Sequence, residues 1–479
     1  MPGPDEGQVP ARLHDHGRCG ERRATLPRVP EGNGGLRVKV AIIGTGYVGL
    51  VTGVGLASVG HSVTCLDMRE SVVESLTAGI PPIFEQGLEE LLAQLLESGS
   101  ISFSLPDVDR LAEADIIMIA VGTPSRDGDI DLSQIRSAAE LAGRAVAAAD
   151  HPIAVVVKST VVPGTTKGLV LDTIAASGAD RESFGIGMNP EFLREGSALV
   201  DFNSPDRIVI GFEDDLARDR LRELYADFSC PKLEVNTQTA ELTKYANNLY
   251  LALQISAANE IANVAARVGG IDPLDVVEGV LSDHRWSGGD GVAGAHPIAK
   301  YLIPGPGFGG SCFPKDVEAF REFGLTLELP MQMSSAILEV NGAQPGFSLD
   351  SMTEGLPPLD GKRVLVLGLS FKPQTDDVRE TPALGMIRAL RAAGATTLAH
   401  DPLAMDAYAR IDGGEVEFVV DWRATVATVD AVLVVTPWAD YRGIGDLLSG
   451  DQVLLDPRRS VDPAGLAAGV VYRSIGVKK

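Results

Sequence analysis

Several residue types are scarce in this sequence, and each scarcity excludes a class of protein. Only 4 of the 479 residues are cysteines, and they are too scattered for a disulfide framework or a Cys-x-x-Cys zinc site. No apolar run reaches the roughly 18 residues that a membrane-spanning helix needs, and no apolar stretch near Met1 indicates a signal peptide. We therefore expect a cytoplasmic protein of a reducing compartment, without a metal site and without a membrane partner.

Positive charge is also scarce. The chain has 41 Lys and Arg residues against 65 Asp and Glu residues, which gives a formal net charge of −24. Such a surface repels a phosphate backbone, so we expect no nucleic acid partner. Aromatic residues reach only 5%, but 45% hydrophobic and 22% charged residues are typical of a globular protein and exclude global disorder. At about 150 residues per domain, the length predicts about three domains.

The first 37 residues differ from the rest of the chain. They are rich in glycine, proline and charged residues and almost free of aliphatic ones. Such a segment buries too little apolar surface to offset the entropy of ordering it, so we predict a disordered tail at 1–37. His14, His16 and Cys19 lie within it, and we interpret them as accidental neighbours rather than metal ligands.

From Val38 onward, short apolar runs alternate with helical patterns. The runs that predict strands lie at 38–43, 62–66, 116–121, 153–157 and 207–210. Strands that alternate with helices predict a parallel, doubly wound sheet. A second unit of this kind starts at Lys362, and its apolar run ending in Thr436-Pro437 repeats the run that ends in Thr123-Pro124.

Between these two α/β units, residues 237–268 predict one long helix with Thr239 as its N-cap. Alanine and leucine occur around more than one side of this helix, so we expect it to be buried between domains or subunits. The predicted fold is therefore α/β, with two Rossmann-like doubly wound domains joined by a long central helix. The expected segments after the tail are residues 38–236, 237–345 and 346–479.

The first strand leads into a glycine-rich turn, Gly44-x-Gly46-x-x-Gly49. In a strand–turn–helix context the first glycine makes the turn, the second lets the backbone approach a pyrophosphate, and the third lets the helix pack closely. Asp67 ends the next strand, where its carboxylate would accept hydrogen bonds from ribose hydroxyls and repel a 2′-phosphate. We therefore predict a dinucleotide site that prefers NAD to NADP, a preference that Arg69 weakens. A structural glycine turn without a nucleotide is the alternative.

A second candidate centre contains Cys312. This cysteine follows several glycines and precedes Lys315 and Asp316, which is typical of an exposed thiol, whereas Cys65 lies in an apolar run as a small core residue does. A thiol together with a nicotinamide site predicts oxidation of an aldehyde through a thioester, with Cys312 as the nucleophile.

These motifs resemble a known family, the UDP-glucose 6-dehydrogenase branch of the UDP-glucose/GDP-mannose dehydrogenases. The resemblance runs from about Val38 to Arg459 and rests on several segments in the same order, at 44–49, 121–124, 158–161, 189–196, 307–316 and 371–382, together with Lys244 and Asn248. It implies an NAD-dependent, four-electron oxidation of UDP-glucose at C6 to UDP-glucuronate, through a thiohemiacetal and a thioester on Cys312. It also implies a homodimer built on the central segment, or a higher homo-oligomer, with the UDP-sugar bound by residues 346–479.

The resemblance also implies roles for individual residues. Lys244 and Asn248, which are four residues apart and so share one helix face, would stabilise oxyanion charge. Glu191 and Asp316 would position or activate water, with Thr160 nearby. The implied NAD contacts are Gly44, Gly46, Val48, Gly49, Asp67, Thr123, Thr160, Glu195, Lys315 and Arg379. The implied sugar-nucleotide contacts are Glu191, Phe192, Leu193, Arg194, Lys244, Asn248, Tyr301, Leu302, Ile303, Pro304, Gly305, Gly309, Lys372 and Arg458.

Two places depart from the pattern of this family. The stretch between Arg285 and Tyr301 is longer than usual, which leaves open whether Arg285 reaches the substrate of a neighbouring subunit. Val72 occupies a position where many relatives have a lysine.

Other functions remain open at this point. Ser311 argues against the N-acetylmannosamine branch, but GDP-mannose or another nucleotide sugar is an alternative substrate. A two-electron hydroxy-acid dehydrogenase would not need Cys312, and a non-enzymatic NAD-sensing scaffold would need neither Cys312 nor Lys244.

Overall fold

The computed structural model describes residues 38–126, 129–287 and 297–478. The predicted tail, with His14, His16 and Cys19, lies outside the described residues. The chain divides into two compact units, which we call the N-terminal unit (38–247 and 318–330) and the C-terminal unit (248–317 and 331–478). The three segments expected from the sequence differ from this division, and their bounds remain a prediction.

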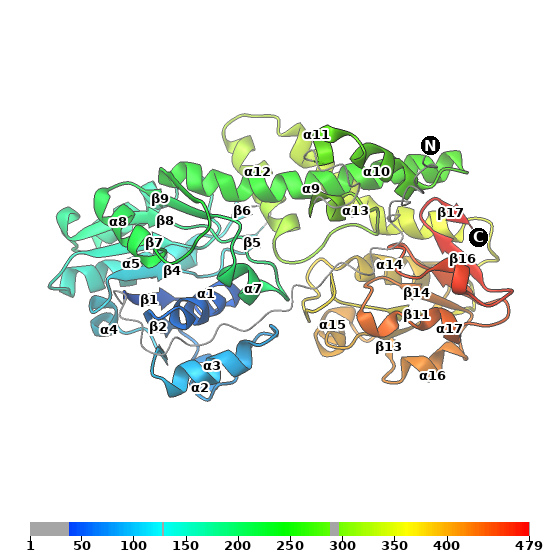
Figure 1. The fold of residues 1–479 in the computed structure, drawn as a ribbon, viewed down its shortest axis with the longest axis horizontal. Coiled ribbons are helices and arrows are strands. Elements are labelled where there is room, and N and C mark those ends of the chain that lie inside the picture. Colours follow the sequence, from blue (N-terminus) through cyan, green and yellow to red (C-terminus); the bar gives the residue numbers. More distant parts are fainter. Residues whose placement is uncertain (1–37, 127–128, 288–296, 479) are drawn as a thin grey trace, which may run out of the picture. The chain divides into compact units, whose positions relative to one another are not determined.

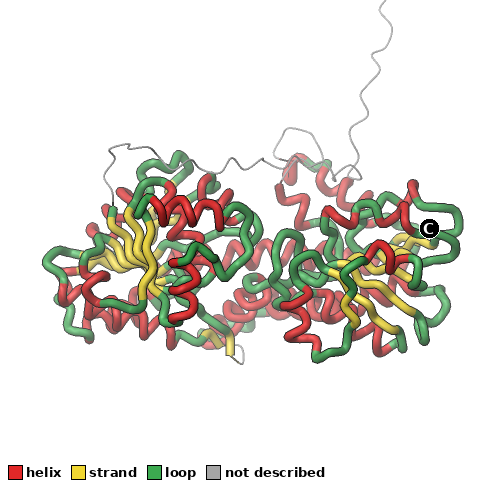
Figure 2. Tube along the Cα trace, turned by 90° about the horizontal axis from the view of Figure 1, so that it is seen from below, coloured by secondary structure: helices red, strands yellow, loops and turns green. Residues whose placement is uncertain are grey.

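The N-terminal unit is built on an eight-stranded sheet that lies between helices (Figures 1 and 2). Its strands have the order β10-β9-β8-β7-β4-β1-β2-β3. Their bounds are β1 (Lys39–Ile43), β2 (Ser62–Leu66), β3 (Ile101–Ser104), β4 (Ile116–Ile119), β7 (Ile153–Val157), β8 (Phe184–Met188), β9 (Ile208–Phe212) and β10 (Lys232–Val235). The main helices around it are α1 (Tyr47–Ser58), α2 (Glu70–Thr77), α3 (Leu88–Glu97), α4 (Val108–Ala112), α5 (Ser133–Ala148), α6 (Leu171–Ala176), α7 (Ala198–Asn203) and α8 (Asp215–Leu224).

Alternation along the strands supplies a hydrophobic core to each face of this sheet. In β1, Val40 and Ile42 join one buried cluster, while Ala41 and Ile43 join the other. Successive side chains of a strand point to opposite faces, so an apolar run covered on both sides builds both layers. The predicted doubly wound sheet is confirmed, but a wholly parallel one is wrong, because β9 pairs with β8 in the antiparallel direction.

The C-terminal unit contains a seven-stranded sheet with the order β13-β12-β11-β14-β15-β16-β17. Only its last pair, β16 with β17, is antiparallel. The strands are β11 (Arg363–Leu367), β12 (Thr396–His400), β13 (Glu417–Phe418), β14 (Ala431–Val434), β15 (Val453–Leu455), β16 (Val471–Ser474) and β17 (Val477–Lys478). Its main helices include α10 (Pro273–Leu281), α11 (His284–Ser287), α13 (Gln332–Thr353), α14 (Pro382–Ala392), α15 (Met405–Asp412), α16 (Trp422–Val426) and α17 (Ile444–Leu447).

Two helices contribute residues to both units, namely α9 (Thr237–Val268) and α12 (Phe313–Thr326). The predicted long helix is present as α9, but its cap is Asn236 rather than Thr239. The Asn236 side chain accepts a hydrogen bond from the Thr239 amide at 2.8 Å, which places Thr239 in the first turn.

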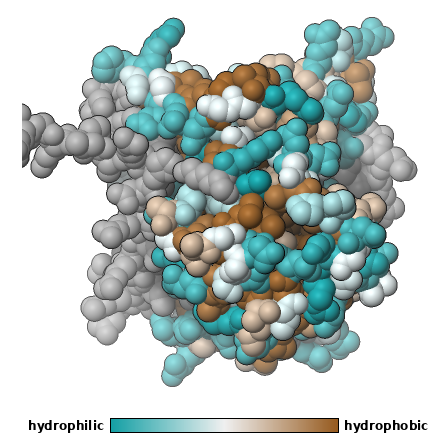
Figure 3. Space-filling model, turned by 90° about the vertical axis from the view of Figure 1, so that its right-hand side faces the viewer, coloured by the Kyte–Doolittle hydropathy of each residue, from teal (hydrophilic) through white to brown (hydrophobic). Residues whose placement is uncertain are grey.

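Apolar side chains also reach the surface of the C-terminal unit, where Figure 3 shows hydrophobic patches among hydrophilic residues. Along α9, Tyr250, Ile261, Val264 and Val268 are exposed. The helix is therefore not buried on every side within the described chain. None of the described helices combines the length and the apolar character that crossing a bilayer requires.

Candidate active site

Close backbone packing explains two of the three glycines in the turn after β1, and the third leaves space beside a helix N-terminus. Gly44 has a φ of +102°, and a side chain there would meet the Ala120 carbonyl oxygen at 2.7 Å. A Cβ at Gly49 would clash with the Gly44 carbonyl group, whereas a Cβ at Gly46 would meet nothing within 4 Å. Gly46 is the N-cap of α1 and supplies no side-chain cap, so the first amides of the helix are left for another acceptor. An open helix N-terminus of this kind fits the pyrophosphate of a dinucleotide.

Asp67, directly after β2, lies beside this turn. Its carboxylate accepts hydrogen bonds from the Thr45 amide and hydroxyl at 3.2 and 2.6 Å, and it pairs with Arg69 at 3.1 Å. Burial by itself would raise the pKa of Asp67, but the bonds from Arg69 and Thr45 outweigh it and lower the pKa to about 2. Asp67 is thus a fixed anion at the carboxyl edge of the sheet, and its partner Arg69 has a largely exposed side chain.

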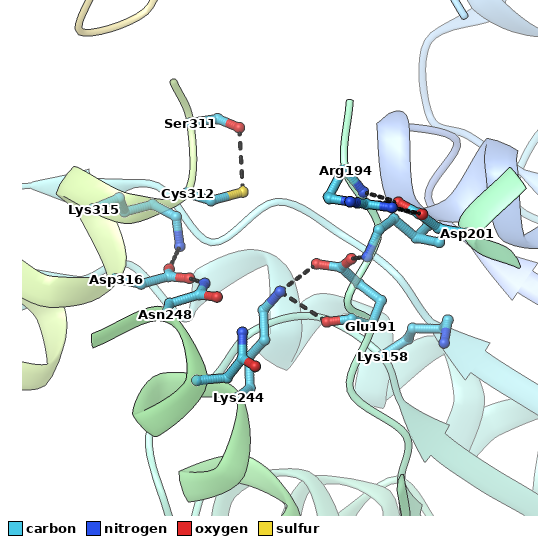
Figure 4. A network of polar contacts seen from close by, with 12 residues as sticks. Lys158, Glu191, Arg194, Asp201, Lys244, Asn248, Ser311, Cys312, Lys315 and Asp316 are labelled. Carbon is cyan, nitrogen blue, oxygen red and sulfur yellow. Dashed lines mark hydrogen bonds and ion pairs between the residues drawn. The ribbon is translucent and has the colours of Figure 1, made fainter. Parts of the chain in front are cut away.

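A buried ion pair forms a second centre of the N-terminal unit. Lys244 on α9 donates to the Glu191 carboxylate at 2.7 Å and to the Glu191 carbonyl oxygen at 2.8 Å (Figure 4). Both side chains are at most 8% exposed. Burial alone would raise the pKa of Glu191, but Lys244, the Leu193 amide and Lys158 lower it overall. The anionic partner that a buried lysine requires is therefore Glu191.

The thiol of Cys312 lies at the first turn of α12 in the C-terminal unit. The Cys312 carbonyl oxygen accepts the Asp316 amide at 2.8 Å, so Cys312 occupies the N-cap position. Its sulfur lies 3.5 Å from the Ser311 hydroxyl, and the residue is partly exposed. A helix N-terminus stabilises negative charge, which suits a thiolate nucleophile. Cys65, by contrast, is fully buried, and burial raises its pKa to about 12.

Asp316 is buried next to this thiol and holds two side chains. Its carboxylate accepts hydrogen bonds from Asn248 and from Lys315, each at 2.7 Å (Figure 4). Because Asn248 lies one turn beyond Lys244, one face of α9 carries both the lysine that pairs with Glu191 and the asparagine that binds Asp316. A carboxylate fixed by an amide and an ammonium group is suited to orienting water.

The loop that carries Cys312 is docked onto the segment after β11. The Gly310 amide donates to the Arg379 carbonyl oxygen at 2.8 Å, and a side chain at Gly309 would collide with the Glu380 carbonyl group. Arg458 donates to the Gly307 carbonyl oxygen at 3.3 Å and to the Val435 carbonyl oxygen at 3.0 Å. Burial lowers the pKa of Arg458 to about 10. Its two acceptors carry no formal charge, so this guanidinium suits a diphosphate.

The remaining predicted site residues range from buried to largely exposed. Thr123 is buried, Thr160 and Glu195 are partly buried, and Lys372 lies 5.5 Å from the centre of the Phe371 ring. Arg194 and Arg379 are largely exposed and pair with Asp201 and Asp377. Arg285 is also exposed and pairs with Asp283. The residues between 301 and 305 are partly or fully buried. Their roles in binding remain predictions.

Sequence reasoning missed several residues that hold these segments. The backbone of Gly305 is held by hydrogen bonds to Asn259 of α9 and Gln344 of α13, and the backbone of Phe308 by bonds to Asn341 of α13. Both positions belong to the loop that precedes Cys312. Glu85 accepts the Tyr47 hydroxyl and the Gly196 and Ala198 amides. Polar residues that bond to loop backbones have no local sequence pattern, because their partners are distant in the chain.

Comparison with known proteins gives matches in the same order along the chain. Three models of the UDP-glucose/GDP-mannose dehydrogenase family match: the NAD binding domain at residues 38–229, the central domain at 238–343 and the UDP binding domain at 365–463. UDP-glucose 6-dehydrogenase YwqF of Bacillus subtilis is 38% identical over 449 residues, which cover 92% of this chain and 98% of that protein.

Two solved structures extend this comparison. A UDP-glucose dehydrogenase from the hyperthermophilic archaeon Pyrobaculum islandicum is 41% identical, has a TM-score of 0.82, and matches over 93% of this chain and 99% of its own. GDP-mannose dehydrogenase from Pseudomonas aeruginosa is 30% identical with a TM-score of 0.51, over 91% of this chain and 99% of its own.

Proposed function

The chain belongs to the UDP-glucose/GDP-mannose dehydrogenase family, and we propose that it oxidises UDP-glucose at C6 to UDP-glucuronate. It is an NAD-dependent oxidoreductase. The observation that carries the proposal is the position of Cys312, a partly exposed thiol at the N-terminus of α12 beside the Asn248–Asp316 pair. A dehydrogenase needs such a thiol when the aldehyde from a first oxidation is oxidised again.

The turn between Gly44 and Gly49 would hold the cofactor. The free amides of α1 would bind its pyrophosphate, and Asp67 would accept hydrogen bonds from a ribose. The negative charge of Asp67 would repel a 2′-phosphate, which supports NAD over NADP. When bound, one NAD molecule would supply the hydride acceptor for each oxidation, so two NAD molecules would be consumed for each sugar.

The first oxidation converts the C6 alcohol of the sugar to an aldehyde. The C6 carbon loses a hydride and its hydroxyl loses a proton, and we assign Glu191 and Asp316 to receive that proton through water. Lys244 would stabilise the negative charge that develops on the C6 oxygen. The Lys244–Glu191 pair supports this assignment, because it holds a buried ammonium group next to a carboxylate.

The second oxidation requires Cys312. Its thiolate adds to the aldehyde carbon, and the resulting oxyanion of the thiohemiacetal is stabilised by Lys244 and Asn248. Loss of a second hydride from that carbon gives a thioester. A water positioned by Asp316 then attacks the thioester carbon, the Cys312 thiolate leaves, and the carboxylate product is formed as the two protons of the water are released to solvent.

Substrate choice is tested by offering UDP-glucose, GDP-mannose and UDP-N-acetylmannosamine separately at equal concentration with NAD. Initial NADH formation should be fastest with UDP-glucose, and mass spectrometry should identify UDP-glucuronate as the product. Faster turnover of GDP-mannose would move the assignment to that branch, an alternative that the relative from Pseudomonas aeruginosa keeps open.

We also assign a second copy of this chain as a partner. Tyr250, Ile261, Val264 and Val268 recur at helical spacing on α9 and are exposed, and an exposed apolar stripe is typical of an interface. Light scattering should give the mass of a dimer, and Val264→Lys should shift the protein towards the monomer. Among the described residues, Cys65, Cys230 and Cys312 form no disulfide, which supports a cytoplasmic location.

A further inference from the structure

One buried lysine has no part in the mechanism described above. Lys158 follows β7, and Asn189 follows the neighbouring parallel strand β8. The Lys158 ammonium group donates to the Asn189 side-chain oxygen at 2.8 Å and to the Asn189 carbonyl oxygen at 3.3 Å. Lys158 is only 5% exposed, so its charge is held at the carboxyl edge of the sheet, away from water.

The amide of Asn189 can adopt only one orientation. Its nitrogen donates to the Val209 carbonyl oxygen at 2.8 Å, while its oxygen accepts from Tyr225 at 2.5 Å as well as from Lys158. Asn189 is followed by Pro190 and then by Glu191. Lys158 therefore holds both the side chain and the backbone at the start of the segment that carries Glu191.

The charges around Glu191 do not balance. Lys244 and Lys158 both act on this single carboxylate, so the cluster has a net positive charge when all three groups are ionised (Figure 4). A further cation of this unit, Arg207, lies over the Phe192 ring at 3.8 Å and donates to Asn247. Burial, with a contribution from Lys244, lowers the pKa of Lys158 to about 8, and Glu191 opposes this shift.

A buried, unbalanced positive charge is unfavourable for stability, because the ammonium group is removed from water without a carboxylate of its own. Asn189 would keep its bonds to Tyr225 and Val209 if Lys158 were an apolar residue of similar length. The side-chain amide of Asn189 would thus keep two of its three hydrogen bonds, and only the bonds from the Lys158 ammonium group would be lost. An excess positive charge is useful where negative charge develops on a substrate oxygen.

We propose that Lys158 is a positioning residue of the oxidation: it fixes the segment from Asn189 to Glu191 and supplies, beside Lys244 and Glu191, a second positive charge that favours the negative charge developing on the substrate oxygen. This inference rests on the proposed function. It adds the expectation that kcat depends on the charge of Lys158, although Lys158 does not contact the sugar.

The test compares wild type, Lys158→Met and Lys158→Arg in NADH formation from UDP-glucose between about pH 6.5 and 9.5. Lys158→Met removes the charge, so kcat at about pH 7 should fall by about tenfold or more, with little change in KM for NAD. As the pH passes about 8, wild type loses the same charge, and the ratio of the wild-type kcat to the Lys158→Met kcat should shrink towards one. Lys158→Arg keeps its charge, so the ratio of its kcat to that of wild type should rise above about pH 8.

The control is Lys167→Met. Lys167 is an exposed lysine that pairs with Glu213 at 3.3 Å, so its replacement should leave kcat unchanged at every pH. Wild type that forms NADH from UDP-glucose establishes the proposed function in the same assay, so failure of that function appears in wild type and failure of this inference only in the variants. A wild-type to Lys158→Met ratio that does not change with pH, or a kcat equal to wild type, would overturn the role of Lys158.

Protein stability gives a second readout. Because the folded state lowers the pKa of Lys158, this group opposes folding at neutral pH, and Lys158→Met should unfold at a temperature equal to or above that of wild type at about pH 7. A clear loss of thermal stability together with a pH-independent loss of activity would assign Lys158 a structural role only. If the Lys158→Met variant does not fold, the Lys158→Arg variant still tests the inference. A ratio of its kcat to the wild-type kcat that does not rise above about pH 8 would contradict the inference.

Discussion

The turn after β1 and the turn after β11 use the same backbone device in the two units. Gly44 and Gly368 both have positive φ values, +102° and +93°, and a side chain at either would meet a carbonyl oxygen, of Ala120 at 2.7 Å or of Thr436 at 2.4 Å. In each unit this oxygen belongs to a residue that comes after the central strand of the sheet, β4 or β14. The glycines are therefore fixed by the packing of neighbouring strands, whatever the turn binds.

The two units differ in the segment that comes after the turn. After Gly44 the chain enters α1 almost at once, with Gly46 as an open N-cap. After Gly368 the chain runs through an irregular segment at 369–381, and α14 begins at Pro382 with Thr381 as its side-chain cap. The first turn thus presents helix amides to an anion, whereas the second presents a loop that contains Lys372 and docks the loop of Cys312.

The aspartates at equivalent positions differ in the same way. Asp67 pairs with Arg69, whose side chain is largely exposed. Asp401 has no exposed surface and accepts hydrogen bonds from five internal N–H groups, those of Leu369, Ser370, Leu403 and Ala404 and the indole of Trp438. One aspartate can exchange its exposed partner for a ligand, while the other has become part of the structure. The fold that the two units share therefore does not decide which of the two turns binds a dinucleotide.

The largest loss of activity is expected from replacing Cys312, the nucleophile on the loop that packs against residues 369–381. Cys312→Ser replaces a thiolate by a weak alcohol nucleophile, so complete turnover to the carboxylate should fall by at least about a hundredfold. NAD binding, measured by fluorescence titration, should stay close to that of wild type, because Cys312 is not part of the first turn. Wild-type turnover in this variant would refute the thioester route.

Replacing the two aspartates tests the comparison itself. Asp401→Asn puts an NH₂ group among N–H donors, so it should lower the free energy of unfolding by about 2–4 kcal/mol in urea denaturation. Asp67→Asn should cost less stability and should raise KM for NAD by about tenfold. If Asp401→Asn raised KM for NAD selectively, or if Asp67→Asn left it unchanged, the contrast between the two positions would be wrong.

Replacing Arg458 tests whether the C-terminal unit binds UDP-glucose rather than NAD. Arg458→Met removes a partly buried guanidinium whose acceptors are carbonyl oxygens, so KM for UDP-glucose should rise by about tenfold, with a smaller change in KM for NAD. Steady-state kinetics with each substrate varied in turn measure the two values. Equal rises in both KM values would indicate a general structural defect instead.

The smallest effect is expected for Arg69→Ala. This change removes an exposed cation beside Asp67, so it should alter KM for NAD by no more than a few fold and weaken NADP binding further. Because Arg69 and Thr45 lower the pKa of Asp67 to about 2, the contribution of Asp67 to stability is present above about pH 4 and is lost as the pH falls towards 2. Arg69→Ala should move that loss to a higher pH in acid denaturation.

Much of this fold was open to prediction from sequence. Apolar runs of strand length, the glycine turn and the 32-residue helix α9 are local patterns, and the structure contains each of them. Strand direction is not local: the apolar run predicted at 207–210 looks the same in a parallel and in an antiparallel strand, so the reversal of β9 could not be foreseen.

The site was open to prediction only in part. Cys312 and the glycines have local sequence patterns, and the family resemblance supplied Glu191 and Lys244. Lys158 and Asn189 meet because β7 and β8 are neighbours, and nothing in either segment indicates the other. The five donors around Asp401 likewise come from several segments, so its sequence position resembles that of Asp67 while its environment does not.

The most direct test of the central claim is the yield of NADH per UDP-glucose consumed, measured to completion with limiting sugar and excess NAD. Two successive hydride transfers on one carbon, joined by a thioester on Cys312, predict a ratio of about two. A ratio of about one, with an aldehyde or a ketone as the product, would contradict the role of Cys312 and leave only a two-electron dehydrogenase.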